Sequence, residues 1–282
     1  MGMSIQTNPG AEFSAIAAKR AAQMMDMAMI RLSSGKRINS ARDDAAGIQV
    51  AVRMEAEING LSSASRNASD AQATVDTAEG GLKEIHTLLL RMREIAVSAA
   101  SDTKTEADRD SLQTEVGALE TEITRIGSST TWGGINLLDG SYSKGSPIKF
   151  QLGPKNGDNI EVTLGYVHAT VAAAAQGTLG LTGAVTTQTA AGNYISTIDA
   201  AISIVSTRRG ALGAVSNRLD STLANLENMK ANLVAAKGQV VDADFAEETA
   251  RLARAQILLQ AATAMLSQAN ASRQQMLALI NN

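Results

Sequence analysis

Residues 61–99 read LSSASRNASDAQATVDTAEGGLKEIHTLLLRMREIAVSA, and aliphatic or alanine side chains recur in this stretch at every seventh position. A second row of the same kind runs three positions further along. Rows with this offset form the a and d seam of a coiled coil or helical bundle. The stretch therefore predicts one helix of roughly 58 Å at a rise of 1.5 Å per residue. The two rows are Leu61, Ala68, Val75, Leu82, Leu89 and Ala96, and Ala64, Ala71, Ala78, Ile85, Met92 and Ala99.

The same repeat returns in three later segments and, more weakly, within residues 11–32. Ser33-Ser34-Gly35 predicts the end of the N-terminal helix. Ser40–Asp43 and Thr105–Asp108 both have the hydroxyl and carboxylate spacing of a capping box, which predicts helix starts. The repeats comprise Leu112, Leu119 and Ile126; Ile198, Val205, Leu212, Leu219, Leu226 and Leu233; Phe245, Leu252, Leu259, Leu266 and Ile280; and Phe13, Ile16, Met24, Met27 and Ile30.

The middle of the chain has a different pattern. Phe150–Leu152 and Ile160–Leu164 alternate apolar and polar residues around a Gly-Pro-Lys-Asn-Gly turn, which predicts a β-hairpin near 148–165. Residues 169–194 are rich in Ala, Gly and Thr and are expected to form a short, loosely structured surface excursion. The predicted fold is mainly α: a long antiparallel helical rod or coiled coil with a small β-hairpin insert and paired N- and C-terminal helices.

Composition argues against several classes of function. The chain has no cysteine, only three Phe, three Tyr and one Trp, and two histidines, His86 and His168, far apart in sequence. We therefore expect no metal, no cofactor and no enzyme activity, because no convergent polar site or ring-filled core is indicated. The net charge of −3 with scattered basic residues indicates no nucleic-acid partner. No apolar run long enough to insert into a membrane is present, nor is a cleavable signal peptide expected.

Several motifs resemble those of the bacterial flagellin family. Residues 31–47, RLSSGKRINSARDDAAG, are similar to its N-terminal signature, as are GLSSASRN at 60–67 and RMREIAV at 91–97. Further motifs match its β region and its C-terminal signature, and the resemblance covers roughly residues 30–165 and 195–282. These further motifs are GINLL at 134–138, FQLGPKNG at 150–157, LGAVSNRL at 212–219, ARAQILLQA at 253–261 and SQAN at 267–270.

The resemblance implies a structural subunit that self-assembles into the helical filament used for motility. It implies that residues 1–42 and 240–282 form the inner coiled-coil layer, and that 43–239 form a helical rod domain without outer domains. The implied partners are other copies of the chain, a flagellar export chaperone, a cap protein and hook-junction proteins. The implied location is the extracellular filament, reached by type III export without a cleaved signal peptide.

Two groups of residues are candidates for contacts with other proteins. A mixed-charge cluster at the predicted joint between helices, comprising Arg31, Arg37, Arg42, Asp43 and Asp44, is interpreted as ion pairing between subunits. With it we place the C-terminal repeat Phe245, Leu252, Leu259 and Leu266. By the resemblance, Arg91, Ile95 and Glu115 match positions through which some flagellins are sensed by an animal innate immune receptor. Asp242 and Asp244 are interpreted as a helix N-terminus rather than an acid–base pair.

Two alternatives remain open from the sequence. One is a hook–filament junction protein, which shares the terminal helices of the family. The other is a cytoplasmic coiled-coil binding module. Growth of filaments with rising protein concentration, seen by electron microscopy, separates the filament subunit from both, because neither alternative should elongate indefinitely.

The C-terminal repeat buries too little to stabilise a helix on its own. Five large side chains give about 7–15 kcal/mol of gross burial, whereas ordering some forty residues costs about 40–80 kcal/mol of backbone entropy. We predict that residues 1–32 and 245–282 exchange their amide hydrogens rapidly in the free monomer and slowly once neighbouring copies surround them. Hydrogen exchange of both states measures this, and strong protection in the monomer would refute it.

Overall fold

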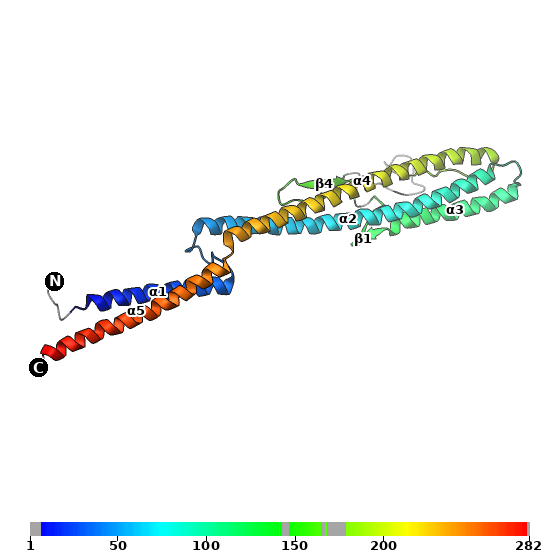
Figure 1. Cartoon of the computed structure of the whole chain (residues 1–282). Coiled ribbons are helices and arrows are strands. Elements are labelled where there is room, and N and C mark those ends of the chain that lie inside the picture. The colour runs from blue at the N-terminus through cyan, green and yellow to red at the C-terminus, as the bar shows by residue number, and fades with distance from the viewer. Residues whose placement is uncertain (1–6, 141, 143–146, 165–166, 168–178, 281–282) are drawn as a thin grey trace. The chain divides into compact units, whose positions relative to one another are not determined.

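The computed structural model describes residues 7–140, 142, 147–164, 167 and 179–280 (Figure 1). Its order of elements confirms the predicted fold class, since helices come first, short β-hairpins follow and two more helices close the chain. The helices are α1 (Pro9–Ser34), α2 (Ala45–Ala99), α3 (Glu106–Ser129), α4 (Gln188–Val241) and α5 (Phe245–Ile280). The strands are β1 (Thr131–Trp132), β2 (Ile135–Asn136), β3 (Ile148–Gln151) and β4 (Asn159–Val162).

The chain divides into two compact units. Residues 1–58 and 232–282 form one, which contains α1 and α5, and residues 59–231 form the other, called here the rod unit. The sequence placed the boundaries at 42/43 and 239/240, next to helix ends. The observed boundaries differ from the predicted ones because they lie inside α2 and α4. An unbroken helix has no change of composition that would mark such a boundary in the sequence.

The core of the rod unit is the seven-residue repeat of α2. All twelve residues of its two rows are buried, which confirms the seam. Val116 and Ile123 of α3 are fully buried, while their neighbours Leu112 and Leu119 pack at the edge. From the predicted repeat of α4 the buried residues are Ile198, Val205, Leu212, Leu219 and Leu226.

Polar links fix the directions of these helices. From α2 to α4, Gln72 bonds Asp220, Glu79 pairs with Arg209 at 2.7 Å and Arg93 pairs with Asp199 at 2.7 Å. Numbers rise along α2 as they fall along α4, so the two helices are antiparallel, as Figure 1 shows within the rod unit. Helix α3 is likewise antiparallel to α2, as Figure 1 shows within the rod unit.

One of the two predicted capping boxes is present. Thr105 accepts a bond from the Asp108 N–H and Asp108 accepts one from the Thr105 N–H, which confirms the cap of α3. The Ser40–Asp43 prediction is wrong: these residues form a turn, and α2 starts at Ala45. Asp44 provides the cap instead, because its carboxylate accepts the Gly47 N–H at 2.9 Å. Helix α1 ends as predicted, at Gly35 with a φ of 68°.

Two antiparallel hairpins follow α3. Strands β3 and β4 confirm the predicted hairpin, with Phe150 opposite Ile160, and Ile160 and Val162 pointing into the core. Strands β1 and β2 were missed. Their turn is Gly133-Gly134, with φ values of 56° and 81°. Adjacent glycines between short β-prone runs are a hairpin signal, so the sequence did contain the clue.

The predicted surface excursion at 169–194 is wrong over its second half. Residues 169–178, like His168, lie outside the described residues. From 179 onward the segment is part of the core: Leu181 and Val185 are buried, and α4 has begun by Tyr194. The buried phenol of Tyr194 donates to Glu120 Oε1 of α3 at 2.5 Å, and the Val185 N–H donates to Gln113 Oε1 at 2.6 Å. The few leucines and the tyrosine of this segment pack it into the core, although small residues separate them.

The Tyr194 bond yields a prediction. In Tyr194→Phe the Glu120 carboxylate loses its donor, so the free energy of unfolding should fall by about 2 kcal/mol, as for a hydrogen bond to a charged group. Urea unfolding followed by circular dichroism measures the change. Tyr142→Phe is the matched control, because Tyr142 is exposed and its change should stay within about 0.5 kcal/mol.

The same residue sets an alkaline limit. Burial, and then the bond to Glu120, raise the pKa of the Tyr194 phenol. A folded-state pKa above the unfolded value of about 10 means that this stabilisation is complete below pH ~10 and is lost as the pH rises further. Wild type should therefore lose stability above pH ~10 more steeply than Tyr194→Phe, and parallel losses would contradict this origin.

Candidate functional site

Helices α1 and α5 form an antiparallel pair that meets through small side chains. Asn8 donates to the Ala269 carbonyl at 3.2 Å at one end, and Arg31 pairs with Glu248 at 3.1 Å at the other. The fully covered residues between these ends are alanines: Ala21 and Ala28 on α1, and Ala255 and Ala262 on α5. We call this contact the alanine seam. Alanines permit a close approach of the two helix axes, but they bury little surface each.

The large apolar side chains of the N- and C-terminal repeats lie outside the alanine seam. Phe13 is 73% exposed, Ile30 56% and Phe245 70%. Leu252, Leu259 and Leu266 flank the seam and are half-buried. The contact between α1 and α5 uses the alanine row three positions away, because alanines permit a closer approach of the helices. The assignment of Phe245, Leu252, Leu259 and Leu266 to contacts between subunits stays a prediction. The other exposed members are Ile16, Met24 and Met27.

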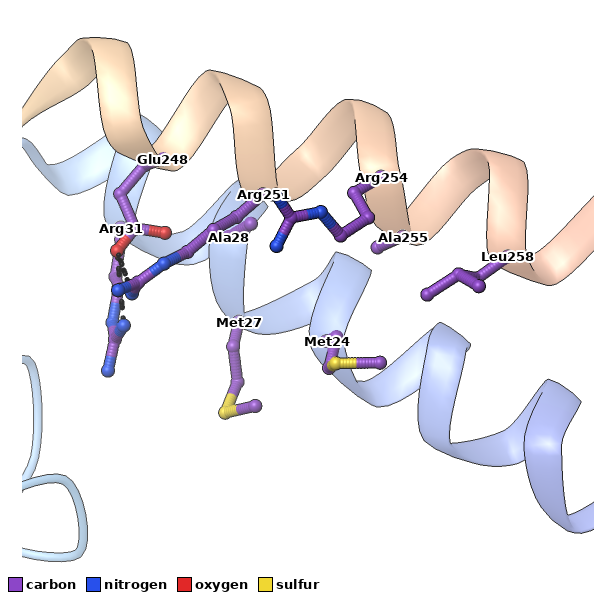
Figure 2. Close-up of a pocket in the computed structure, with 9 residues that line it drawn as sticks. All are labelled: Met24, Met27, Ala28, Arg31, Glu248, Arg251, Arg254, Ala255 and Leu258. Carbon is purple, nitrogen blue, oxygen red and sulfur yellow. Dashed lines mark hydrogen bonds and ion pairs between the residues drawn. The ribbon is translucent and has the colours of Figure 1, made fainter.

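An open groove beside the alanine seam is lined by four of these large side chains, Phe13, Ile16, Met24 and Met27, together with Leu258. Figure 2 shows one part of it. One part has a volume of about 300 Å³ and the next about 420 Å³. Both parts are lined by Met24 and Leu258, so they form one continuous feature, called here the end-helix groove. Its other walls include Phe13, Ile16, Arg20, Met27 and Arg31 from α1, and Glu248, Arg251 and Arg254 from α5.

One buried carboxylate organises the end of the groove near the helix joint. The Glu248 side chain is only 5% exposed and accepts from Arg31 at 3.1 Å and from Arg251 at 2.9 Å. Figure 2 shows these contacts as dashed lines. Arg31 therefore has its partner within the chain. Arg20 and Arg254 form no hydrogen bond or ion pair with any residue that the structure describes, so the groove keeps uncompensated positive charge.

The rest of the predicted charge cluster lies in the connection between α1 and α2. The Arg37 N–H and guanidinium donate to the carbonyls of Val241 and Val240, both at 2.7 Å. Asp43 closes the 40–43 turn, and the N–H groups of Ser40 and Asn39 hold the pKa of its carboxyl below the usual value.

Within the described part of the chain only Arg42 of this cluster has no such bond, since Arg31 pairs with Glu248 and Asp44 caps α2. The carboxylate of Asp244 accepts the N–H groups of Ala246 and Glu247 at the start of α5, as the sequence indicated. The cluster thus builds the joint of the chain itself.

The structure brings together two of the three residues matched to an immune-receptor surface. Arg91 pairs with Glu115 at 2.9 Å across α2 and α3, and both are solvent-accessible. Ile95 is 3% exposed and belongs to the rod core. Ile95 is therefore wrongly included in an exposed surface, because its position on α2 faces the core of the rod unit.

Comparison with known proteins supplies the family. The model of the bacterial flagellin N-terminal helical region matches residues 6–143, and that of the C-terminal helical region matches residues 195–280. The chain belongs to the bacterial flagellin family. It is 40% identical to a flagellin of Halalkalibacterium halodurans over 90% of both chains. It is 35% identical to flagellin FlaB1 of Treponema pallidum over 89% of this chain and 90% of that one.

A solved structure agrees with the assignment. The crystal structure of Bacillus cereus flagellin is 30% identical, with a TM-score of 0.50, over 61% of this chain and 94% of that chain. This flagellin is accordingly a structural subunit of a flagellar filament. Among the described residues no helix is long and apolar enough to cross a membrane, and no cluster of metal-binding side chains is present.

The buried carboxylate yields a prediction. Glu248→Gln leaves two guanidinium groups of the same chain without their charged acceptor, so each subunit's end-helix pair should be less stable by about 2 kcal/mol and filaments should dissociate at a lower temperature. Light scattering during heating measures this. Glu247→Gln is the matched control, because Glu247 is 61% exposed, pairs only with Arg251 and should matter little. Equal effects of the two changes would contradict the role of Glu248.

Proposed function

We propose that copies of this flagellin polymerise by docking into the end-helix groove and onto the exposed faces of α5. The observation that carries the proposal is the placement of the large apolar side chains. An open groove is lined by Phe13, Ile16, Met24, Met27 and Leu258, while alanines fill the contact within the chain. Monomeric proteins rarely leave contiguous apolar surface of this kind uncovered. A helix from another copy is a suitable occupant, because the groove runs along a helix pair.

The distribution of apolar residues around α5 favours a polymer over a dimer. Ile257 is 66% exposed and is two positions from Ala255, which puts it about 160° around the helix from the alanine seam. Phe245 and Leu258 lie on opposite flanks of that seam. Apolar residues thus face every side of α5, as in a helix surrounded by others. Different surfaces meeting in a head-to-tail manner give an open helical assembly.

Charge supports contacts between like copies. Arg20 and Arg254 line the groove, and Glu12 and Asp26 lie exposed elsewhere on α1. All four form no ion pair with the described residues of their own chain. Opposite charges left open on different faces of one molecule suit pairing between neighbours.

The finer assignments rest on the family. We infer that residues 1–42 and 240–282 form the inner layer of an extracellular filament, that no outer domain is inserted, and that the subunit meets an export chaperone, a cap protein and hook-junction proteins. Arg42, free of bonds within the described chain, is the best remaining candidate for pairing between subunits at the joint. The exposed pair Arg91 and Glu115 remains the candidate immune-receptor contact.

Seeded growth tests the proposal. A chain lacking 245–282 should fail to elongate seeds. Ile16→Asp should raise the critical concentration more than about 100-fold, because a charge cannot be buried in an apolar contact. Electron microscopy and sedimentation measure both. Ile16→Leu, which keeps the apolar volume, is the matched control. Filaments of ordinary length from the truncated chain, or normal growth of Ile16→Asp, would overturn the proposal.

A further inference from the structure

We propose that the thioethers of Met24 and Met27 form an oxidation site, and that peroxide modification there blocks the unassembled subunit from polymerising. The inference rests on the proposed function, since it assigns a regulatory chemistry to the same groove. It adds a covalent modification, the two residues that carry it and the stage of assembly at which it acts.

Sulfur chemistry in this chain belongs entirely to methionine. There is no cysteine, and four of the eleven methionines fall within residues 24–29. Met24 is 43% exposed and Met27 47% exposed. Both line the end-helix groove, and Figure 2 labels both on α1. Oxidation of a thioether depends on access of the oxidant, and here access and the proposed contact surface coincide.

These two exposed methionines differ from Met92, which is a buried core residue. Met92 has no exposed surface and sits among the α2 rows. Methionine in a core is protected, and its flexible chain fills gaps. Two other exposed methionines, Met29 at 46% on α1 and Met229 at 40% on α4, line neither part of the groove. They provide an internal comparison with the same chemistry and similar access.

The step itself is a two-electron oxygen transfer from hydrogen peroxide. A sulfur lone pair attacks one peroxide oxygen, the O–O bond breaks, an S–O bond forms and water leaves after proton transfer. The sulfur is oxidised to the sulfoxide and the peroxide is reduced. The product is a polar group that accepts hydrogen bonds, where an apolar side chain stood. In the polymer the groove is covered, so the reaction is confined to the unassembled subunit.

Docking onto an oxidised groove buries each sulfoxide oxygen against incoming apolar side chains, which offer it no hydrogen-bond donor. Such burial costs enough to raise the critical concentration by about tenfold for each sulfoxide. Methionine sulfoxide reductases specific for the two epimers reverse the modification. Growth should therefore return after reductase treatment, which irreversible damage would not allow.

The test compares three purified full-length chains with and without hydrogen peroxide treatment, each carrying Met265→Leu because Met265 lies on an exposed face of α5: the reference chain with no other change, Met24→Leu with Met27→Leu, and Met29→Leu with Met229→Leu. Leucine keeps the apolar volume and has no sulfur to oxidise. Critical concentrations from seeded growth are measured, and peptide mass spectrometry locates each added oxygen. We expect the critical concentration to rise about tenfold or more in the oxidised reference chain and in the Met29/Met229 variant, reversed by reductases, and less than about threefold in the Met24/Met27 variant.

Three outcomes would overturn the inference: unchanged growth of the oxidised reference chain, equal loss in the Met24/Met27 variant, or protection by the Met29/Met229 variant alone. Oxidation of Met24 and Met27 within intact filaments at the monomer's rate would also overturn it. Failure of untreated wild type to elongate seeds is a different result, since it sinks the proposed function itself.

Discussion

Close approach of α1 and α5 over four buried alanines is the contact on which the behaviour of the chain ends depends. Two helices can cover only one narrow stripe of each other, and here that stripe is assigned to the smallest side chains. The stripe holds the pair in register, with the Glu248 carboxylate between two guanidiniums at one end. It also leaves Phe13, Ile257 and Phe245 facing water. A subunit built this way has unsatisfied apolar surface on several sides, which is the condition for growth by addition of identical copies.

The rod unit solves the same problem differently. There α2 is covered by α3, α4 and the hairpin region, so both rows of its repeat are buried and the core is complete within one chain. Buried Tyr194 links α4 to α3 through its bond to Glu120, and the segment before α4 joins this core through the Val185 bond to Gln113 of α3. The physical contrast is in the number of neighbours that each helix has within its own chain. The rod has enough of them, whereas the end helices have one each.

The placement of methionine follows from that contrast. In the rod core, Met92 is covered and serves as packing material. On α1, Met24 and Met27 line a groove that a neighbouring copy is proposed to fill. A flexible thioether side chain suits an interface that must accept another helix. The same sulfur is open to oxidation as long as no neighbouring copy covers it. Assembly surface and chemical sensitivity thus have one cause, the exposure of large apolar side chains outside the alanine seam.

The sequence by itself determined the helices, their order and the α2 seam. A period of seven in apolar residues is typical of packed helices, and the Thr105 cap and the Gly35 stop depend only on neighbouring residues. The sequence also determined the family, through motifs such as residues 31–47. Only the tertiary structure decided which stripe of α1 and α5 makes their contact, because alanine and leucine rows three positions apart are equally periodic and differ only in how closely they let two helices approach. It likewise decided that Ile95 is buried, that Arg31 pairs with Glu248 and that Leu181 and Val185 belong to the core. Each of these depends on a partner more than a dozen residues away in the chain, and a local pattern carries no record of that partner.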